Sequence, residues 1–184
     1  MSRFASLCLA VACLATAQIS MAHADTNPAD RSHLTTVADY TPPLGFQLFC
    51  LANPGHCQGG GQSEIALTDA LWAELQHVNA SVNRAIRPRA DSDDVWALGV
   101  SSGDCEDYVL AKRAMLIQAG VPASALRIGV GTYRGQAHAV LVVRTGQGDL
   151  VLDNMDGTIR QWNQTEINWI AMSRADPLRW GTIG

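Results

Sequence analysis

Apolar positions recur with a helical period in the middle of the chain. From Leu71 to Ile86, leucine, valine and isoleucine return every three or four residues, which is one face of an amphipathic helix. Thr68 and Asp69 suit its start as N-cap and first-turn acid, and Pro88 ends it. The pattern predicts an α-helix that packs one side on a core.

A second helix is predicted from about residue 104 to residue 119. It is apolar around most of its circumference, and only Lys112, Arg113 and Gln118 offer an obvious solvent-facing side. Gly120 stands at the expected C′ position. Such a helix should lie buried at the centre of the fold.

The pattern changes to short β-branched runs in the second half of the chain. Residues 127–133, 138–144 and 149–153 are such runs, separated by turns that contain glycine, which is typical of antiparallel sheet. Trp162 and Trp169 follow in a stretch whose pattern predicts no element. Helices followed by a sheet that packs on them predict an α+β fold.

The beginning of the chain follows a different pattern. Residues 4–19 are apolar and uncharged, and Ala22-His23-Ala24 precedes an abrupt polar stretch, as in a secretory signal peptide with an A-x-A cleavage site. A membrane anchor needs about 20 strongly apolar residues, and this segment is shorter. We expect residues 1–24 to be a cleaved signal peptide, 25–41 a polar arm and 42–184 the folded domain, with no membrane span after cleavage.

Charge excludes some classes of partner. The chain has 13 Lys and Arg residues, one of them in the signal peptide, against 17 Asp and Glu, so the mature net charge is 12 minus 17, or −5. No basic run is present. Nucleic acid and anionic membrane surfaces are therefore not expected as partners.

An odd number of cysteines remains after the signal peptide. Cys50 and Cys57 lie seven residues apart across a turn-rich loop, so a disulfide is expected there in an oxidising compartment. In the competing interpretation, Cys50, His56 and Cys57 bind a metal, but a fourth ligand at a recognisable spacing is missing. Cys105 is then the lone thiol.

The position of Cys105 favours a reactive thiolate. The residue falls in the first turn of the second predicted helix, where free N–H groups and the helix dipole stabilise a negative sulfur. Asp104, Glu106 and Asp107 act against this, because carboxylates raise the pKa of a nearby thiol. A bound cation would neutralise them.

A hairpin supplies a base and a residue to orient it. A two-residue or four-residue loop between the last two runs sets a register in which Asp153 faces Val140 and His138 is its diagonal neighbour on the same face, about 7–8 Å away at Cα. A three-residue loop would place them on opposite faces. With Cys105, the pair forms the nucleophile, base and third group of acyl chemistry. Each residue alone also fits a structural role, as a buried thiol, a backbone-bonded imidazole or a turn former.

The same residues resemble a known family. Gly-Asp-Cys-Glu-Asp-Tyr at 103–108, His-Ala-Val-Leu at 138–141 and Leu-Val-Leu-Asp-Asn at 150–154 are similar in order and spacing to the catalytic blocks of bacterial transglutaminase-like cysteine peptidases. That family is a branch of the papain-like and transglutaminase-like superfamily. The lead-in at 45–50 resembles the N-terminal block of its shorter members, and the resemblance covers about residues 42–170.

The resemblance implies a transglutaminase-like fold and a thiol protease with the triad Cys105, His138 and Asp153. It implies a periplasmic enzyme that acts on a protein or peptide substrate, such as a cell-surface adhesin, although a substrate does not follow from a fold. It also implies calcium, Ca2+, bound by Asp104 and Glu106. Two alternatives stay open: acyl transfer from a glutamine side chain by the same triad, and an inactive protein-binding module.

Overall fold

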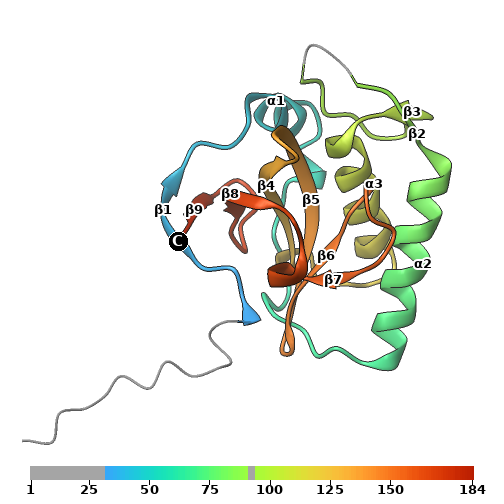
Figure 1. Cartoon of the computed structure of the whole chain (residues 1–184), viewed down its shortest axis with the longest axis vertical. Helices are drawn as coiled ribbons and strands as arrows, with labels where there is room; N and C mark the ends of the chain where they lie inside the picture. Colours follow the sequence, from blue (N-terminus) through green and yellow to red (C-terminus); the bar gives the residue numbers. More distant parts are fainter. Residues whose placement is uncertain (1–31, 91–93) are drawn as a thin grey trace, which may run out of the picture.

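The computed structural model describes residues 32–90 and 94–184 (Figure 1). The signal peptide expected at residues 1–24 lies outside them. The α-helices are α1 (Leu44–Ala52), α2 (Asp69–Ala85) and α3 (Cys105–Gln118), and the 3-10 turns are η2 (Pro54–His56), η3 (Ala123–Ala125) and η4 (Trp162–Gln164). The strands are β1 (Thr36–Tyr40), β2 (Arg87–Pro88), β3 (Ser102–Gly103), β4 (Leu126–Tyr133), β5 (Gln136–Thr145), β6 (Gly148–Leu152), β7 (Arg160–Gln161), β8 (Asn168–Ser173) and β9 (Trp180–Ile183).

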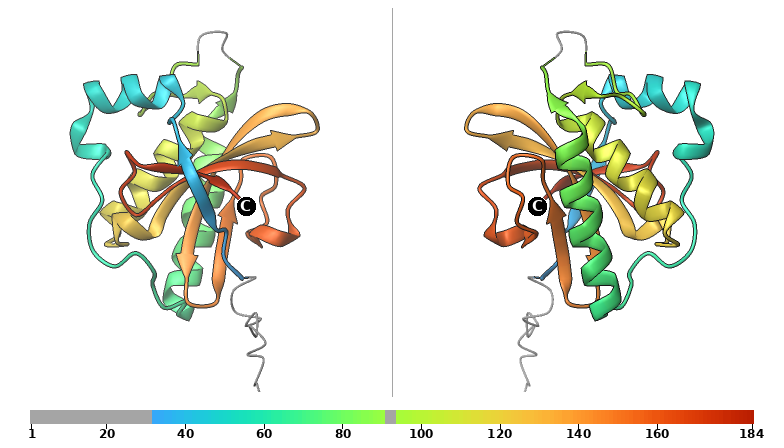
Figure 2. Two further views of the ribbon diagram at one scale, coloured as in Figure 1. Left: turned by 90° about the vertical axis from the view of Figure 1, so that its left-hand side faces the viewer. Right: turned by 90° about the vertical axis from the view of Figure 1, so that its right-hand side faces the viewer.

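A seven-stranded sheet carries the fold. Its order is β1-β9-β8-β4-β5-β6-β7, every neighbouring pair is antiparallel, and β2 and β3 form a separate parallel pair. α3 packs on β5, and α2 packs on α3. The right-hand view of Figure 2 shows α2 in front of α3, with the sheet behind both. The predicted α+β fold is confirmed.

The helix predicted from the apolar period forms as α2. The Thr68 hydroxyl accepts a hydrogen bond from the Leu71 N–H at 3.1 Å, so the expected N-cap is present. The buried residues of α2 lie on the face that the spacing predicted, and they are Leu75, Val78, Asn79 and Val82. Local sequence therefore defines both the start and the buried side of this helix.

The predicted solvent-facing side of α3 is wrong at Lys112 and Arg113, whereas Gln118, its third residue, is exposed. Lys112 and Arg113 are 1 % and 3 % exposed, because α2 and the loops around α3 cover this side. Their long side chains carry the charged ends to backbone carbonyls. Lys112 Nζ donates to Leu152 O at 3.4 Å. The Arg113 guanidinium donates at 2.6–3.4 Å to the carbonyls of His56, Gln58, Ala123 and Leu126.

The β5–β6 hairpin has the register expected from its loop. Thr145 pairs with Gly148 across a two-residue loop, and Leu141 pairs with Leu152. Asp153 directly follows β6, in line with the expected position opposite Val140. The loop length thus sets which side chains share a face of the sheet.

The N-terminal segment is part of the sheet. Residues 36–40, which the sequence pattern assigned to a polar arm, form the edge strand β1 against β9. Leu34 is buried, its N–H donates to Asp149 Oδ2 at 2.8 Å, and its carbonyl accepts from Arg144 at 2.7 Å. An edge strand that buries little side-chain surface has a weak apolar pattern, so its sequence looks like that of a loop.

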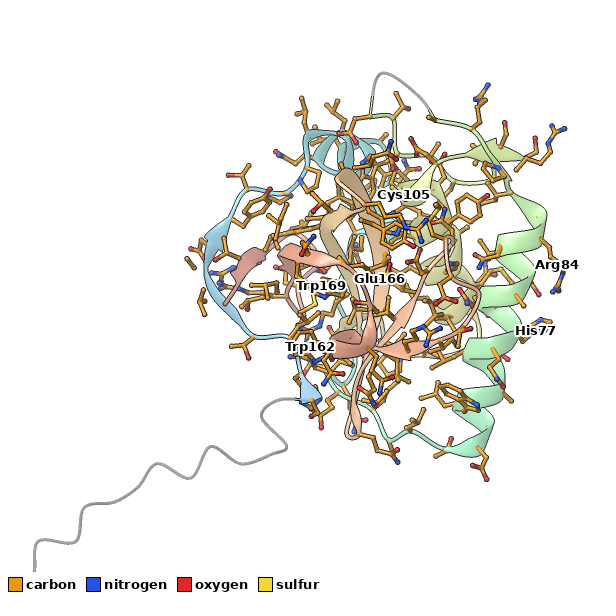
Figure 3. All side chains as sticks on the ribbon, in the orientation of Figure 1. His77, Arg84, Cys105, Trp162, Glu166 and Trp169 are labelled. Carbon is orange, nitrogen blue, oxygen red and sulfur yellow. A yellow bond between two sulfur atoms is a disulfide. The ribbon has the colours of Figure 1, made fainter. Side chains whose placement is uncertain are left out.

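The unassigned C-terminal stretch forms β7, η4, β8 and β9. Trp162 and Trp169 pack on a small core made of Leu34, Val140, Val142, Val151, Ile167 and Met172 (Figure 3). Val140 and Val142 alternate along β5 with residues of the main core. Because alternate residues of a strand point to opposite faces, the small core lies on the sheet face away from α3.

The cysteines pair as expected. Cys50 and Cys57 form a disulfide with a Cα–Cα distance of 5.6 Å, which ties α1 to the turn after it, and Cys105 is a free thiol. Among the described residues, no helix is long and apolar enough to cross a membrane.

Candidate active site

Cys105 is the first residue of α3, and Asp104 is the N-cap. Its Sγ–H donates to Glu106 Oε2 at 3.1 Å, and the sulfur accepts a hydrogen bond from the Ala139 N–H of β5. The thiol therefore lies between the start of α3 and the residue next to His138. Figure 3 shows it at the upper end of α3.

His138 and Asp153 form a hydrogen-bonded pair. His138 Nε2 lies 2.9 Å from Asp153 Oδ1, and both residues are 8 % exposed. Oδ1 also accepts from the Met155 N–H at 2.9 Å. Since Nε2 is occupied by the carboxylate, Nδ1 is the imidazole nitrogen available for another reacting group.

One cleft is lined by both the thiol and the imidazole. Its volume is about 610 Å³, and Cys105 and His138 both line it, with Asp104 and Glu106 beside them. Much of the remaining lining is aromatic or aliphatic. These side chains are Tyr40, Pro43, Pro88, Trp96, Val130, Tyr133, Met155 and Ile170.

Acidic neighbours oppose ionisation of the thiol. Burial raises the pKa of Cys105 to about 12, helped by the charge and hydrogen bond of Glu106 and by the charge of Asp104, while the Ala139 N–H acts the other way. Burial raises the pKa of Glu106 to about 7, helped by a hydrogen bond in which the protonated Glu106 carboxyl donates to Asp104. Without a positive partner at this carboxyl pair, the thiol stays protonated at neutral pH.

The carboxyl pair suits a hard cation. Asp104 and Glu106 are close enough to share a hydrogen bond, and two adjacent carboxyl oxygens are a typical start of a calcium site. Asp107 is committed elsewhere, since its Oδ1 accepts from the Ala97 N–H at 2.8 Å. In the part of the chain that the structure describes, no three His, Cys, Asp or Glu side chains group as metal ligands. Calcium takes six to eight oxygen ligands, of which this pair supplies a part.

The family model of bacterial transglutaminase-like cysteine proteinases, BTLCP, matches residues 36–184. The chain belongs to this family. The match extends the resemblance described above at both ends and includes β1 and β9. The family is one of cysteine peptidases.

Three solved structures of LapG from Legionella pneumophila share the fold. Calcium-bound LapG is 27% identical with a TM-score of 0.55, and the match covers 62% of this chain and 71% of that chain. A second LapG structure is 28% identical with a TM-score of 0.52 over 57% and 64% of the two chains. EGTA-treated LapG is 27% identical with a TM-score of 0.51 over 55% and 62%. No curated protein sequence matches significantly.

Sequence reasoning missed several groups around the family motifs. Ala139 supplies a backbone donor to the thiol, and Asn83 Nδ2 of α2 donates to the Asp153 carbonyl at 2.9 Å. Lys112 approaches the same turn from α3. The alternation along β5 could have pointed to the Ala139 N–H, but contacts of Lys112 and Asn83 depend on how α2, α3 and β6 pack.

Proposed function

We propose that this chain is an exported cysteine peptidase that cleaves a protein substrate with Cys105 as nucleophile. His138 acts as general base and then general acid, and Asp153 orients the imidazole. The 2.9 Å contact between His138 Nε2 and Asp153 Oδ1 carries the proposal, because it leaves Nδ1 for the thiol in the same cleft. A nucleophile, a base and an orienting group are the parts that covalent acyl chemistry needs.

The chemistry follows from these positions. The thiol proton moves to His138 Nδ1 as Sγ attacks the scissile carbonyl carbon, and the peptide C–N bond breaks when the imidazolium returns the proton to the leaving amine. Water, deprotonated by the same imidazole, then cleaves the thioester and releases a free acid. The Cys105 N–H, at the first position of α3, donates to the oxyanion.

Asp104 and Glu106 are the residues that would hold calcium. The ion would supply positive charge at the carboxyl pair that raises the pKa of Cys105. The calcium-bound and EGTA-treated structures of LapG support calcium as the cation. This chain's contribution is the pair of carboxyls at the first turn of α3, where they lie next to the nucleophile.

The cleft indicates an extended protein segment as substrate. Its open shape and apolar lining suit a chain that presents small or apolar side chains on both sides of the scissile bond. We place the enzyme in the periplasm, on the basis of the signal-peptide pattern at residues 1–24. A cell-surface adhesin is the substrate suggested by the family resemblance.

Comparing cells that carry the wild-type protein with cells that carry Cys105→Ala tests this function. Envelope and surface proteomes are compared for proteins that are released or gain new N-termini. We expect such products only with the wild-type protein, and equal products from both strains would refute the proposal. A labelled amine incorporated at a glutamine side chain, with release of ammonia and without cleavage of the backbone, would show protein-glutamine acyl transfer instead of hydrolysis.

A further inference from the structure

A second cavity lies beside the active-site cleft. Its volume is about 420 Å³, and the side chains of Tyr133 and Met155 line both spaces. Asp153 lines the second cavity, whereas His138 lines the cleft, so the hydrogen-bonded pair stands between the two. A substrate bound in the cleft can therefore extend a side chain past Tyr133 and Met155 into the second cavity.

Five charged side chains line the second cavity, and three of them are already paired. The Asp153 carboxylate is hydrogen-bonded to the imidazole at 2.9 Å, and the Asp156 carboxylate accepts from Arg160 at 2.7 Å. The other two are Arg134 and Glu166, both of them exposed. Among the described residues, neither side chain takes part in an ion pair. The second cavity therefore offers a substrate one unpaired cation and one unpaired anion.

Arg134 is linked to the imidazole through an aromatic ring. Its Cζ lies 5.0 Å from the centre of the Tyr133 ring, and the centre of that ring lies 5.8 Å from the centre of the His138 ring. The guanidinium is therefore at most about 11 Å from the imidazole, the sum of the two distances. An extended peptide advances about 3.3 Å per residue, so Arg134 is within reach of a side chain about three residues from the scissile bond.

Arg134 occupies a turn position that disfavours arginine. Tyr133 pairs with Gln136 across a two-residue loop, and φ is +51° at Arg134 and +80° at Gly135. Positive φ at both loop residues is the type I′ pattern, which favours Asn-Gly and Asp-Gly. Figure 2 shows this turn of the β4–β5 hairpin projecting from the body of the molecule. Strained residues of this kind cluster at active sites and ligand clamps, so the arginine indicates a role in binding.

We propose that Arg134 is a specificity-determining residue: its guanidinium binds the carboxylate of an Asp or Glu side chain of the substrate, about three residues from the scissile bond. This inference rests on the proposed function. The planar guanidinium matches a carboxylate with two parallel N–H···O hydrogen bonds, and its contact with the Tyr133 ring holds it beside the cleft. The apolar cleft takes the residues that flank the scissile bond, and the second cavity takes the acidic side chain.

The experiment begins with a peptide library, made by chymotrypsin digestion of a bacterial proteome and blocked at its amines. The full mature chain is added with excess calcium, and new N-termini are identified by mass spectrometry. Cys105→Ala is the blank. We expect Asp and Glu to be enriched at one position within about three residues of the cleavage site, the reach set by the spacing of an extended chain.

The best-cleaved peptide is then synthesised with Glu, Gln or Lys at that position and with an amidated C-terminus, so that the peptides differ in charge only at this side chain. We expect kcat/KM of the wild type to be about tenfold higher for the Glu peptide than for the Gln peptide, as for a hydrogen bond between charged groups. Arg134→Asn should bring this ratio to about one, and Arg134→Asp should favour the Lys peptide. Both replacements suit a type I′ turn, so their melting temperatures should equal or exceed that of the wild type.

Arg84→Gln is the control, because it removes a cation from the outer side of α2 (Figure 3) and should keep the ratio of Glu to Gln peptide. A ratio near one in the wild type, or a ratio that survives in Arg134→Asn, would overturn the role of Arg134. A preference for the Lys peptide that Glu166→Gln abolishes would overturn it as well, and would assign the second cavity to basic side chains. Identical N-termini from wild type and Cys105→Ala would contradict the peptidase function itself, and the role of Arg134 would fail with it.

Discussion

The first turn of α3 and the turn that carries Arg113 both bury charged groups. Hydrogen bonds compensate the charge well at Arg113 and poorly at the first turn. At Arg113, one guanidinium donates to four backbone carbonyls, and burial lowers its pKa only to about 10. At the first turn, the carboxyls of Asp104 and Glu106 lie beside each other and beside a thiol. The well-compensated charge of Arg113 holds loops on the helix, while the poorly compensated carboxyls lie beside the proposed nucleophile. Local conflict of this kind is a feature of functional sites.

The same buried helix serves two purposes, because its middle is fixed by hydrogen bonds and its start is left electrostatically strained. A change at the first turn or at the proposed partners of Cys105 should alter reactivity more than stability. A change at Arg113 should do the reverse.

Asp153→Asn should give the largest effect. The asparagine keeps the size of the aspartate, but a single atom, Oδ1, contacts both His138 Nε2 and the Met155 N–H. An amide NH2 at that position donates to His138 Nε2, places the ring proton on Nδ1 and loses the Met155 hydrogen bond. An amide oxygen there keeps both contacts but removes the negative charge that stabilises the imidazolium. The corresponding change in a serine triad lowers turnover by about 10⁴-fold, and we expect a loss of about 10³- to 10⁴-fold. The rate of cleavage of the substrate found in the envelope comparison measures it. A loss smaller than tenfold, with an unchanged melting temperature, would remove Asp153 from the mechanism.

Arg113→Met should give the largest loss of stability. Four backbone carbonyls lose their donor, and we expect the free energy of unfolding to fall by about 3 kcal/mol, within the range for breaking a buried polar network. Urea unfolding measures the change. Arg84→Met, on the outer side of α2 (Figure 3), is the matched control and should stay within about 0.5 kcal/mol of wild type.

The reactivity of Cys105 should not fall with the stability of Arg113→Met. In the folded Arg113→Met protein, iodoacetamide should label Cys105 at the wild-type rate, because Arg113 contacts neither the thiol nor the His138–Asp153 pair. A reduced rate in the folded protein would show that the two parts of α3 are coupled.

Local sequence was sufficient for the elements that present the site. Thr68 and the apolar period defined α2, and a two-residue loop fixed the register that brings Asp153 to the face of His138. These features depend on residues close together in the chain, where capping and strand alternation act. The family motif then identified which thiol, imidazole and carboxylate to consider.

Long-range packing decided what the sequence did not reveal. Lys112 and Arg113 looked solvent-facing because periodicity reports the residue type, and it does not report where the end of a long side chain comes to rest. Their acceptors are contributed by elements distant in sequence, such as β6 and η2. β1 was missed because it pairs with β9, about 140 residues later in the chain, and pairing over such a distance leaves no local signal.

The smallest effect is expected from Glu106→Gln. This variant tests the electrostatic strain at the first turn of α3 through the pH dependence of the melting temperature. The pKa of Glu106 is raised from 4.5 to about 7, so between these values the folded state binds more protons than the unfolded state. Stability of the chelated wild-type protein should therefore fall as pH rises from about 5 to about 7. Glu106→Gln cannot lose that proton, and its melting temperature should stay flat over the same window.

Calcium should cancel the same loss in the wild-type protein, because an ion bound at Asp104 and Glu106 stabilises the ionised carboxyls and binds only the folded state. Melting curves in EGTA and in calcium, at several pH values, measure both effects, and Glu74→Gln on α2 is the control carboxyl. Curves for the chelated wild-type protein that do not change with pH, or a calcium shift that survives in Glu106→Gln, would show that the first turn of α3 is not strained by this pair. The burial of the Cys105 thiol would then be the one remaining feature that distinguishes the first turn of α3 from the well-compensated site of Arg113.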